Sequence, residues 1–311
     1  HQIPEIGLEE YETSDYLLKI INGLPQENLE IKRWKTAILV HLNGENKNYT
    51  IGYRTDIDGL PVEEKTGLPF SSKHEGRMHA CGHDIHMTVA LGVLSYFASY
   101  RPKYNMTFIF QPAEENASGG MKLYQSGELD EWMPDEIYAL HDNPQLPAGT
   151  IGCRKGTLFA GTCEIHVKFI GKSGHAAYPH QANDMVVAGA QFVNQIQTIV
   201  SRNVDPIQSG VVTLGHFSAG TTGNVISGVC QIDGTIRALT QENNLLIQKR
   251  VRTIAEGIAH SFDCELEIDL HQGGYYPVEN DDNTTEAFIN YMKNEDDVDF
   301  VETLPAMTGE E

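Results

Sequence analysis

The apolar positions in the first 140 residues follow two patterns, one with a step of about four residues and one of short continuous runs. The first pattern predicts amphipathic helices, and the second, where turn residues bound it, predicts strands. The predicted helices cover 10–22 and 85–100, and the predicted strands cover 36–42, 49–53, 107–110 and 135–140. Strands that alternate with helices favour an α/β domain with a mostly parallel sheet and helices on both faces.

A different order of elements begins near Phe159. The predicted strands there cover 162–170, 210–217, 225–237 and 265–270, and the predicted helices cover 184–200 and 242–262. This β-α-β-β-α-β order is typical of ferredoxin-like domains. We therefore expect an α+β ferredoxin-like lid at 159–270, inserted into a catalytic domain made of 1–158 and 271–311. A chain of 311 residues also favours two domains over one.

The net charge limits the partners that the protein can have. The chain holds 22 basic and 43 acidic residues, a formal net charge of −21. An acidic surface disfavours nucleic acids and anionic membranes as partners. No apolar run is long enough for a membrane span, and we expect no signal peptide before the first motif. The five cysteines are odd in number and sparse, which favours the reducing cytoplasm.

The densest chemistry lies in one stretch, Met78–His86, which holds a thiol, three imidazoles and a carboxylate. Each of these groups would need a buried partner if the stretch belonged to a folding core. A divalent metal uses the same groups directly as ligands. A polar loop that enters a helix with chance histidines is the alternative, and we favour the metal interpretation.

Two further segments carry ligand-type residues at the ends of predicted strands. Glu114 and Glu115 follow one strand, and His141 follows another. The adjacent glutamates should point in different directions, so one can bind metal while the other acts as a general base for water. A solvated turn and an ordinary histidine are the alternatives. Asp56 and Asp58 could be ligands or neighbours of ligands, although turn chemistry is the simpler explanation for both.

Three residues of the predicted lid could contact a ligand. His175 lies among small residues after a strand, Asn224 follows a glycine, and Arg237 lies in a strand with few other charges. A guanidinium can bind a carboxylate through two parallel hydrogen bonds. An exposed turn histidine, a turn amide and a salt bridge on the sheet are the alternative roles of these three residues, and the residues alone favour those alternatives.

Together these motifs resemble the two-metal peptidases that include aminoacylases, and most closely the amidohydrolases that cleave N-acyl amino acids such as hippurate and indoleacetyl-amino acids. The motifs that carry the resemblance are Met78–Asp84 and Gln111–Glu115. The resemblance implies one or two divalent metals, with zinc, manganese, cobalt and nickel all suited to sulfur, nitrogen and oxygen ligands. It implies Cys81, His83, Glu115 and His141 as metal ligands and Glu114 as the general base.

The same resemblance implies roles for the lid. The lid would form a homodimer, and His175 would stabilise the oxyanion at the partner subunit's site. Asn224 and Arg237 would hold the polar and carboxylate groups of a small N-acyl amino acid. Family members supply a last histidine ligand beyond a segment like Thr308-Gly309-Glu310, so a chain that stops at Glu311 is expected to lack it.

Longer stretches resemble more closely the family members that act on N-acetyl-L,L-diaminopimelate in lysine biosynthesis. They include Ile51–Arg54, Asp56–Pro61, Lys73–Arg77, Asn183–Val187 and Ser201–Pro206. The resemblance implies that the products are diaminopimelate and acetate. A broader hydrolase of hippurate-type substrates and an inactive binding homologue are the alternatives.

Overall fold

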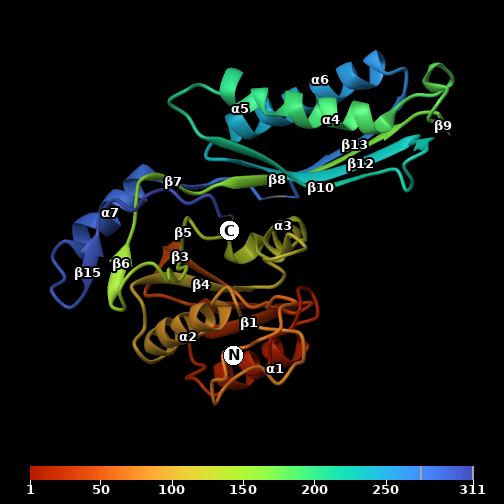
Figure 1. Cartoon of the computed structure of the whole chain (residues 1–311). Coiled ribbons are helices and arrows are strands. Elements are labelled where there is room, and N and C mark those ends of the chain that lie inside the picture. The colour runs from red at the N-terminus through yellow and green to blue at the C-terminus, as the bar shows by residue number, and fades with distance from the viewer. Residues whose placement is uncertain (274, 310–311) are drawn as a thin grey trace. The chain divides into compact units, whose positions relative to one another are not determined.

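The computed structural model describes residues 1–273 and 275–309, and these residues form two compact units. The first unit is His1–Pro147, and the second begins at Ala148. Each unit has its own sheet and its own hydrophobic core (Figure 1). The boundaries that we derived from the sequence, with the lid at 159–270, stay a prediction.

The first unit is built on a five-stranded sheet with the order β1-β2-β4-β3-β5. The strands are β1 (Leu29–Trp34), β2 (Ala37–Leu42), β3 (Asn46–Asp56), β4 (Tyr104–Gln111) and β5 (Glu136–Ala139). Strand β3 runs parallel to β4 and β5, whereas β2 runs antiparallel to both β1 and β4. The predicted α/β class is confirmed, with the correction that the sheet is mixed rather than mostly parallel.

Helices cover both faces of this sheet, as predicted (Figure 1). On one face lie α1 (Tyr11–Ile21) and α2 (His83–Ser99), and on the other lie α3 (Gly119–Gln125) and the 3₁₀ helix η1 (Asp130–Trp132). Every residue of β2 is therefore buried, with Val40 packed towards α1 and α2 and Leu39 packed towards α3. A strand covered on both faces reads as a continuous apolar run, which is why β2 was predictable.

The parallel strands decide where a site can form in the first unit. Because β3, β4 and β5 point the same way, their carboxyl ends meet at one edge of the sheet. Asp56, the last residue of β3, is paired in register with Gln111, the last residue of β4. The segments that follow these strands carry the ligand-type residues predicted from the sequence.

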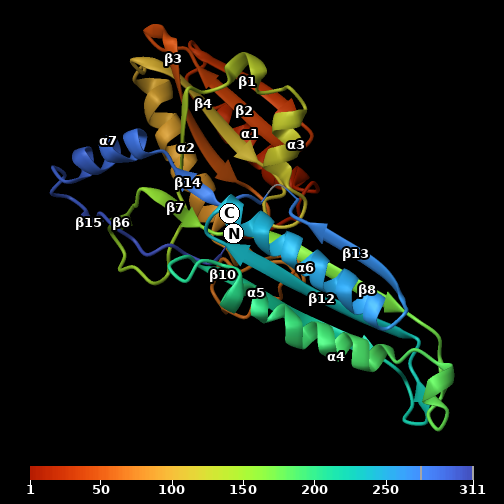
Figure 2. The ribbon, with the colours of Figure 1, turned by 90° about the horizontal axis from the view of Figure 1, so that it is seen from above.

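The second unit contains a four-stranded antiparallel sheet with the order β10-β12-β8-β13. Its strands are β8 (Gly161–Ile170), β10 (Gly210–Ala219), β12 (Val229–Ala238) and β13 (Glu265–His271). The helices α4 (Met185–Ile196), α5 (Thr198–Arg202) and α6 (Gln241–Ser261) cover one face (Figure 2). This arrangement confirms the predicted β-α-β-β-α-β order.

Side chains of β8 alternate between the two faces of that sheet. Cys163, Ile165, Val167 and Phe169 are buried in the core under the helices. The intervening residues, from Thr162 to Lys168, point to the opposite face. One face of the sheet therefore builds the core, and the other carries polar side chains.

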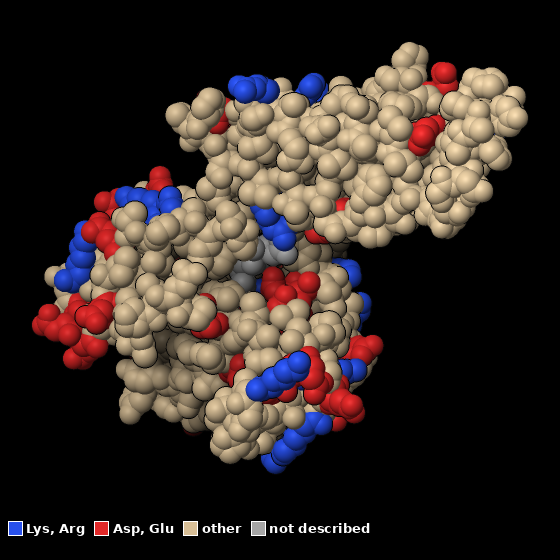
Figure 3. Space-filling view, in the orientation of Figure 1, with Lys and Arg blue, Asp and Glu red and all other residues tan. Residues whose placement is uncertain are grey.

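Short elements complete the second unit. They are β6 (Thr150–Gly152), β7 (Gly156–Phe159), β9 (Gly174–His175), the 3₁₀ helix η2 (Pro179–Gln181), β11 (Val225–Ile226), β14 (Val278–Asn280), α7 (Asp282–Met292) and β15 (Asp299–Val301). Strand β14 pairs with β7 and β15 pairs with β6, so the segment after β13 returns to residues 150–159. Acidic side chains, with basic ones among them, gather over α7 and β15 (Figure 3). Among the described residues, no helix combines the length and apolar character that crossing a membrane requires.

Candidate metal centre

The ligand-type residues of the first unit converge at the carboxyl end of its parallel strands. Cys81 and Gly82 precede α2, and His83 is the first residue of that helix. Glu114 and Glu115 follow β4, and His141 follows β5. Gly82 has a φ of 80°, a left-handed conformation that glycine adopts at no steric cost, and this turn directs the chain into α2.

The structure brings together the four residues predicted as metal ligands. Donor atoms of Cys81, His83 and Glu115 all lie within 4.8 Å of one another. The Cys81 Sγ atom also lies 3.6 Å from Nε2 of His141. A thiol, two imidazoles and a carboxylate at these distances match the donor set that divalent transition metals prefer.

The hydrogen bond of His83 explains why this imidazole can serve as a ligand. Its Nδ1 lies 2.8 Å from the backbone carbonyl oxygen of Asp58 and donates to it. In the neutral imidazole that a metal binds, the proton would therefore lie on Nδ1, and the lone pair of Nε2 would face the other donors. Nε2 is buried and makes no hydrogen bond with any residue that the structure describes. Such a buried polar atom costs about 1–3 kcal/mol, which a bound cation would offset.

The charge around His83 also fits a cation. Burial disfavours the charged imidazole, but Asp58, Cys81 and Asp56 outweigh that effect and raise the pKa of His83 to about 12. The surrounding carboxylates therefore attract positive charge to this point strongly enough to hold a proton there. A divalent metal would supply the same charge without a protonated ligand.

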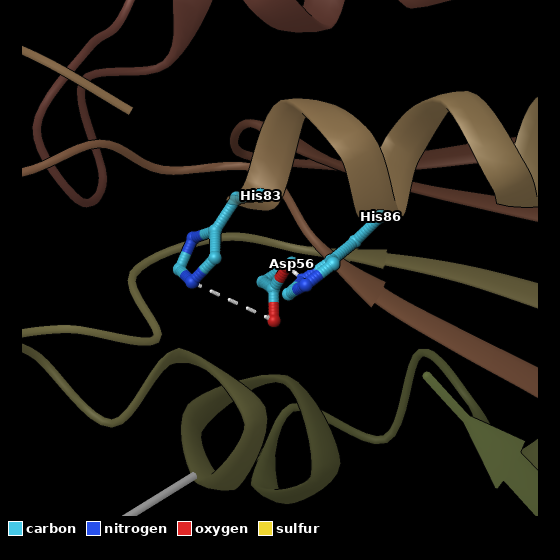
Figure 4. A group of neighbouring side chains, drawn as sticks. All are labelled: Asp56, His83 and His86. Atoms are coloured by element: carbon cyan, nitrogen blue, oxygen red, sulfur yellow. Dashed lines mark hydrogen bonds and ion pairs between the residues drawn. The ribbon is translucent and has the colours of Figure 1, made fainter. Parts of the chain in front are cut away.

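Asp56 links two histidines of α2 (Figure 4). Its Oδ1 lies 2.8 Å from Nδ1 of His86, and its Oδ2 lies 3.8 Å from Nε2 of His83. Burial alone would raise the pKa of Asp56, but the hydrogen bond from His86 and the Arg54 guanidinium at 2.9 Å lower it well below its ordinary range. Asp56 is therefore an ionised, fully buried carboxylate, which simple turn chemistry does not explain.

Sequence reasoning did not assign His86 and Asp142 to the site. His86 lies three residues after His83 and so on the same face of α2, a spacing that could have revealed it. Its Nε2 accepts a hydrogen bond from the backbone N–H of Asp142 at 2.9 Å. Donor atoms of His86, His141 and Asp142 form another group within 4.8 Å of one another. The tertiary contact with Asp142 had no signal in the sequence.

The two glutamates both reach His83. Glu114 is buried, and its Oε2 lies 3.8 Å from Nε2 of His83, the same distance as Oε1 of Glu115. The backbone N–H of Glu115 donates to the Asp58 carboxylate at 3.0 Å. Ala113, just before the pair, has a φ of 53°, which turns the chain sharply after β4. These contacts hold Glu114 and Glu115 in the cluster, so the two residues do not form a solvated turn.

The three candidate residues of the predicted lid lie in two places within the second unit. Strands β9 and β11 pair His175 with Val225, which brings His175 close to Asn224 in the chain. Arg237 is paired with Thr162 at the opposite end of β8. The strand from Thr162 to Ile170 spans roughly 26 Å, and β9 follows it. His175 and Arg237 of one chain therefore do not share one small site.

Residues 52–311 match the peptidase family M20/M25/M40. The chain belongs to this family. An N-acetyldiaminopimelate deacetylase of Ligilactobacillus salivarius is 99% identical over 311 residues, which are all of this chain and 82% of that protein. The corresponding deacetylase of Lactiplantibacillus plantarum is 70% identical over 315 residues, again with 100% and 82% covered.

A solved structure of the same family supports the fold. The YXEP protein of Bacillus subtilis, described as a dinuclear metal binding peptidase of the M20 family, is 30% identical with a TM-score of 0.81. The alignment covers 100% of this chain and 81% of that one. The resemblance to metal-dependent peptidases that the motifs indicated is therefore confirmed at the level of the family. The ligand roles of the individual residues stay predictions.

Proposed function

We propose that the protein hydrolyses the amide bond of an N-acetylated amino acid with the help of divalent metal, and that its substrate is N-acetyl-L,L-diaminopimelate. The 99% identity to a named deacetylase carries the substrate assignment. The cluster of Cys81, His83, Glu115 and His141 carries the chemistry. The products would be acetate and diaminopimelate, which places the reaction in lysine biosynthesis.

The residues around His83 support one or two metals. Cys81, His83, Glu115 and His141 would hold them, with the buried Nε2 of His83 as the atom that most needs a cation. Zinc, manganese, cobalt and nickel all suit this set of donors. When bound, the metal would polarise the acyl carbonyl and increase the acidity of water.

Glu114 would then move the proton. Its carboxylate is buried beside His83, 3.8 Å from Nε2 of that residue, so it would reach a water molecule held at the cluster. It would take a proton from the attacking water and pass that proton to the leaving amine when the C–N bond breaks. Asp58 would keep the arrangement in place, because its carboxylate holds the backbone of Glu115 and its carbonyl orients His83.

We further propose that the protein acts as a homodimer formed through the lid. The separation between His175 and Arg237 supports this proposal, because a histidine so far from Arg237 could contribute to the site of another subunit. His175 would stabilise the oxyanion there, and Asn224 and Arg237 would hold the substrate's polar and carboxylate groups. We expect the cytoplasm as the location, since all five cysteines are free thiols.

Side-by-side kinetics test the substrate. The protein, extended to the length of its relatives and loaded with metal, should release acetate from N-acetyl-L,L-diaminopimelate with a higher kcat/KM than it shows on hippurate. A higher value on hippurate would favour the broader N-acyl amino acid hydrolase. Metal binding without hydrolysis of either compound would favour an inactive binding homologue.

A further inference from the structure

The face of the second-unit sheet opposite the helices carries polar side chains in rows. The register of the strands places Thr213, Thr235 and Glu164 side by side across β10, β12 and β8. One step of two residues further along β12, His216 and His166 flank Asp233 in the same way. Neighbouring rows on one face are about 7 Å apart. This surface therefore offers fixed polar groups at regular spacing.

A depression of about 330 Å³ lies on this face and combines charges of both signs. Its side chains include one guanidinium, two carboxylates and two hydroxyls, from Arg237, Glu164, Asp233, Thr213 and Thr235. Gly215, at an irregularity in β10, also lines it and has open space where a side chain would lie. A small ligand with both a negative and a positive group would find a counter-charge for each.

Arg237 and Glu164 are connected through one hydroxyl group. Nη1 of Arg237 donates to Oγ1 of Thr235, and that hydroxyl donates to Oε1 of Glu164 at 3.3 Å. The guanidinium is also held by the hydroxyl of Thr162 and by the carbonyl of Ile236 at 3.1 Å. These contacts fix the position of the Arg237 guanidinium. The exposed carboxylate of Glu164 is linked to it through the hydroxyl of Thr235.

Asp233 adds a second carboxylate that is held in its charged form. Nδ1 of His166 lies 2.9 Å from Oδ1, Nδ1 of His216 lies 2.7 Å from Oδ2, and Gln231 donates at 3.3 Å. These hydrogen bonds, the one from His166 first, lower the pKa of Asp233. The negative charge is thus maintained at a fixed position in the row next to Glu164.

We propose that Glu164 and Asp233 bind the free ammonium group of the substrate, beside a carboxylate bound at Arg237. This inference rests on the proposed function, in which Arg237 holds a substrate carboxylate. A diaminopimelate with one acetylated nitrogen retains one ammonium group and two carboxylates, whereas a hippurate-type substrate has no ammonium group. The two acidic side chains would therefore select a diamino acid over neutral N-acyl amino acids.

The test compares two substrates that differ only in that ammonium group. They are N-acetyl-L,L-diaminopimelate and N-acetyl-L-2-aminopimelate, assayed by acetate release with the metal-loaded protein extended to the length of its relatives. The variants are Glu164→Gln, Asp233→Asn and, as a matched control, Glu267→Gln. Glu267 lies on β13 of the same sheet, pairs with Lys168 at 3.0 Å and does not line the depression.

We expect each of the first two variants to lower kcat/KM for the diamino substrate about 10-fold, the loss of one charged hydrogen bond of about 1.4 kcal/mol. The same variants should change kcat/KM for the aminopimelate less than about 2-fold, and Glu267→Gln should change neither value. If the parent protein releases acetate and both variants keep its ratio of kcat/KM between the two substrates, this inference is overturned and the proposed function stands. No release from the diamino substrate by the parent would overturn the proposed function and this inference with it.

Discussion

Replacement of Gly82 by alanine should disturb the candidate metal centre by two separate effects. Gly82 lies between Cys81 and His83 with a φ of 80°, where alanine costs roughly 1–2 kcal/mol in backbone strain. An added Cβ would also lie 2.0 Å from Oδ1 of Asp142. That carboxylate would have to rotate away and would lose its 3.0 Å contact with His86.

Gly76 provides the matched control, because it has a φ of 70° and open space where an added Cβ would lie. Gly76→Ala should cost only the backbone strain, roughly 1–2 kcal/mol. Gly82→Ala should cost about 1–3 kcal/mol more, the penalty for the displaced carboxylate and the histidine it contacts. The displaced loop should also lower metal affinity, since Cys81 and His83 flank the substituted residue.

Urea unfolding with and without metal, together with competition against a chelator of known affinity, measures both effects. The expected result is a larger loss of unfolding free energy and weaker metal binding in Gly82→Ala than in Gly76→Ala. Equal stability and equal metal affinity in the two variants would refute the role that we assign to the Gly82 turn.

Three other predictions concern single groups. Cys81→Ala should lower metal affinity at least about 10-fold in chelator competition, and unchanged affinity would remove Cys81 from the ligand set. A chelator should lower the melting temperature and added zinc should restore it, because a bound metal stabilises the folded state. A melting temperature that neither addition changes would argue against a structural metal. Burial raises the pKa of Glu10, although hydrogen bonds from Thr36 and Ala113 act in the opposite direction. The protonated Glu10 therefore contributes its full stability to the fold below the ordinary pKa of a glutamate, and this contribution is lost as pH rises through the raised pKa. The melting temperature of Glu10→Gln should therefore rise relative to that of the parent as pH increases from the ordinary pKa of a glutamate through the raised pKa of Glu10. A pH-independent difference would contradict this account.

The parts of the fold that the sequence predicted are those in which one face or both faces of an element are buried. Strand β8 shows a clear period because its apolar residues pack against a single core. Helix α2 was predicted from apolar residues four positions apart, but its buried apolar residues are Met87, Ala90 and Leu94, and Ile85 is exposed. Strand β1 was missed because it lies at the edge of the sheet and is mostly half-exposed, with charged Lys32 and Arg33 in its sequence. The antiparallel pairing of β2 with β4 was missed for a different reason, since no local pattern encodes it.

The candidate site was predictable where several ligand types lie close in sequence. Cys81 and His83 lie two residues apart, and Glu114 and Glu115 are adjacent. The part played by Asp56 depends on α2 lying over the end of β3, which only the folded chain shows. Turn chemistry was the better local explanation for that residue, and the buried contact with His86 overrides it.

Glu114→Gln tests the central claim most directly, because it removes the proposed proton acceptor and preserves the size of the side chain. The variant and the parent, both extended to the length of their relatives, would be compared for bound metal and for acetate released from N-acetyl-L,L-diaminopimelate. The account predicts metal content close to that of the parent and a kcat lowered at least about 100-fold. Near-parental acetate release with metal bound would show that Glu114 is not the base.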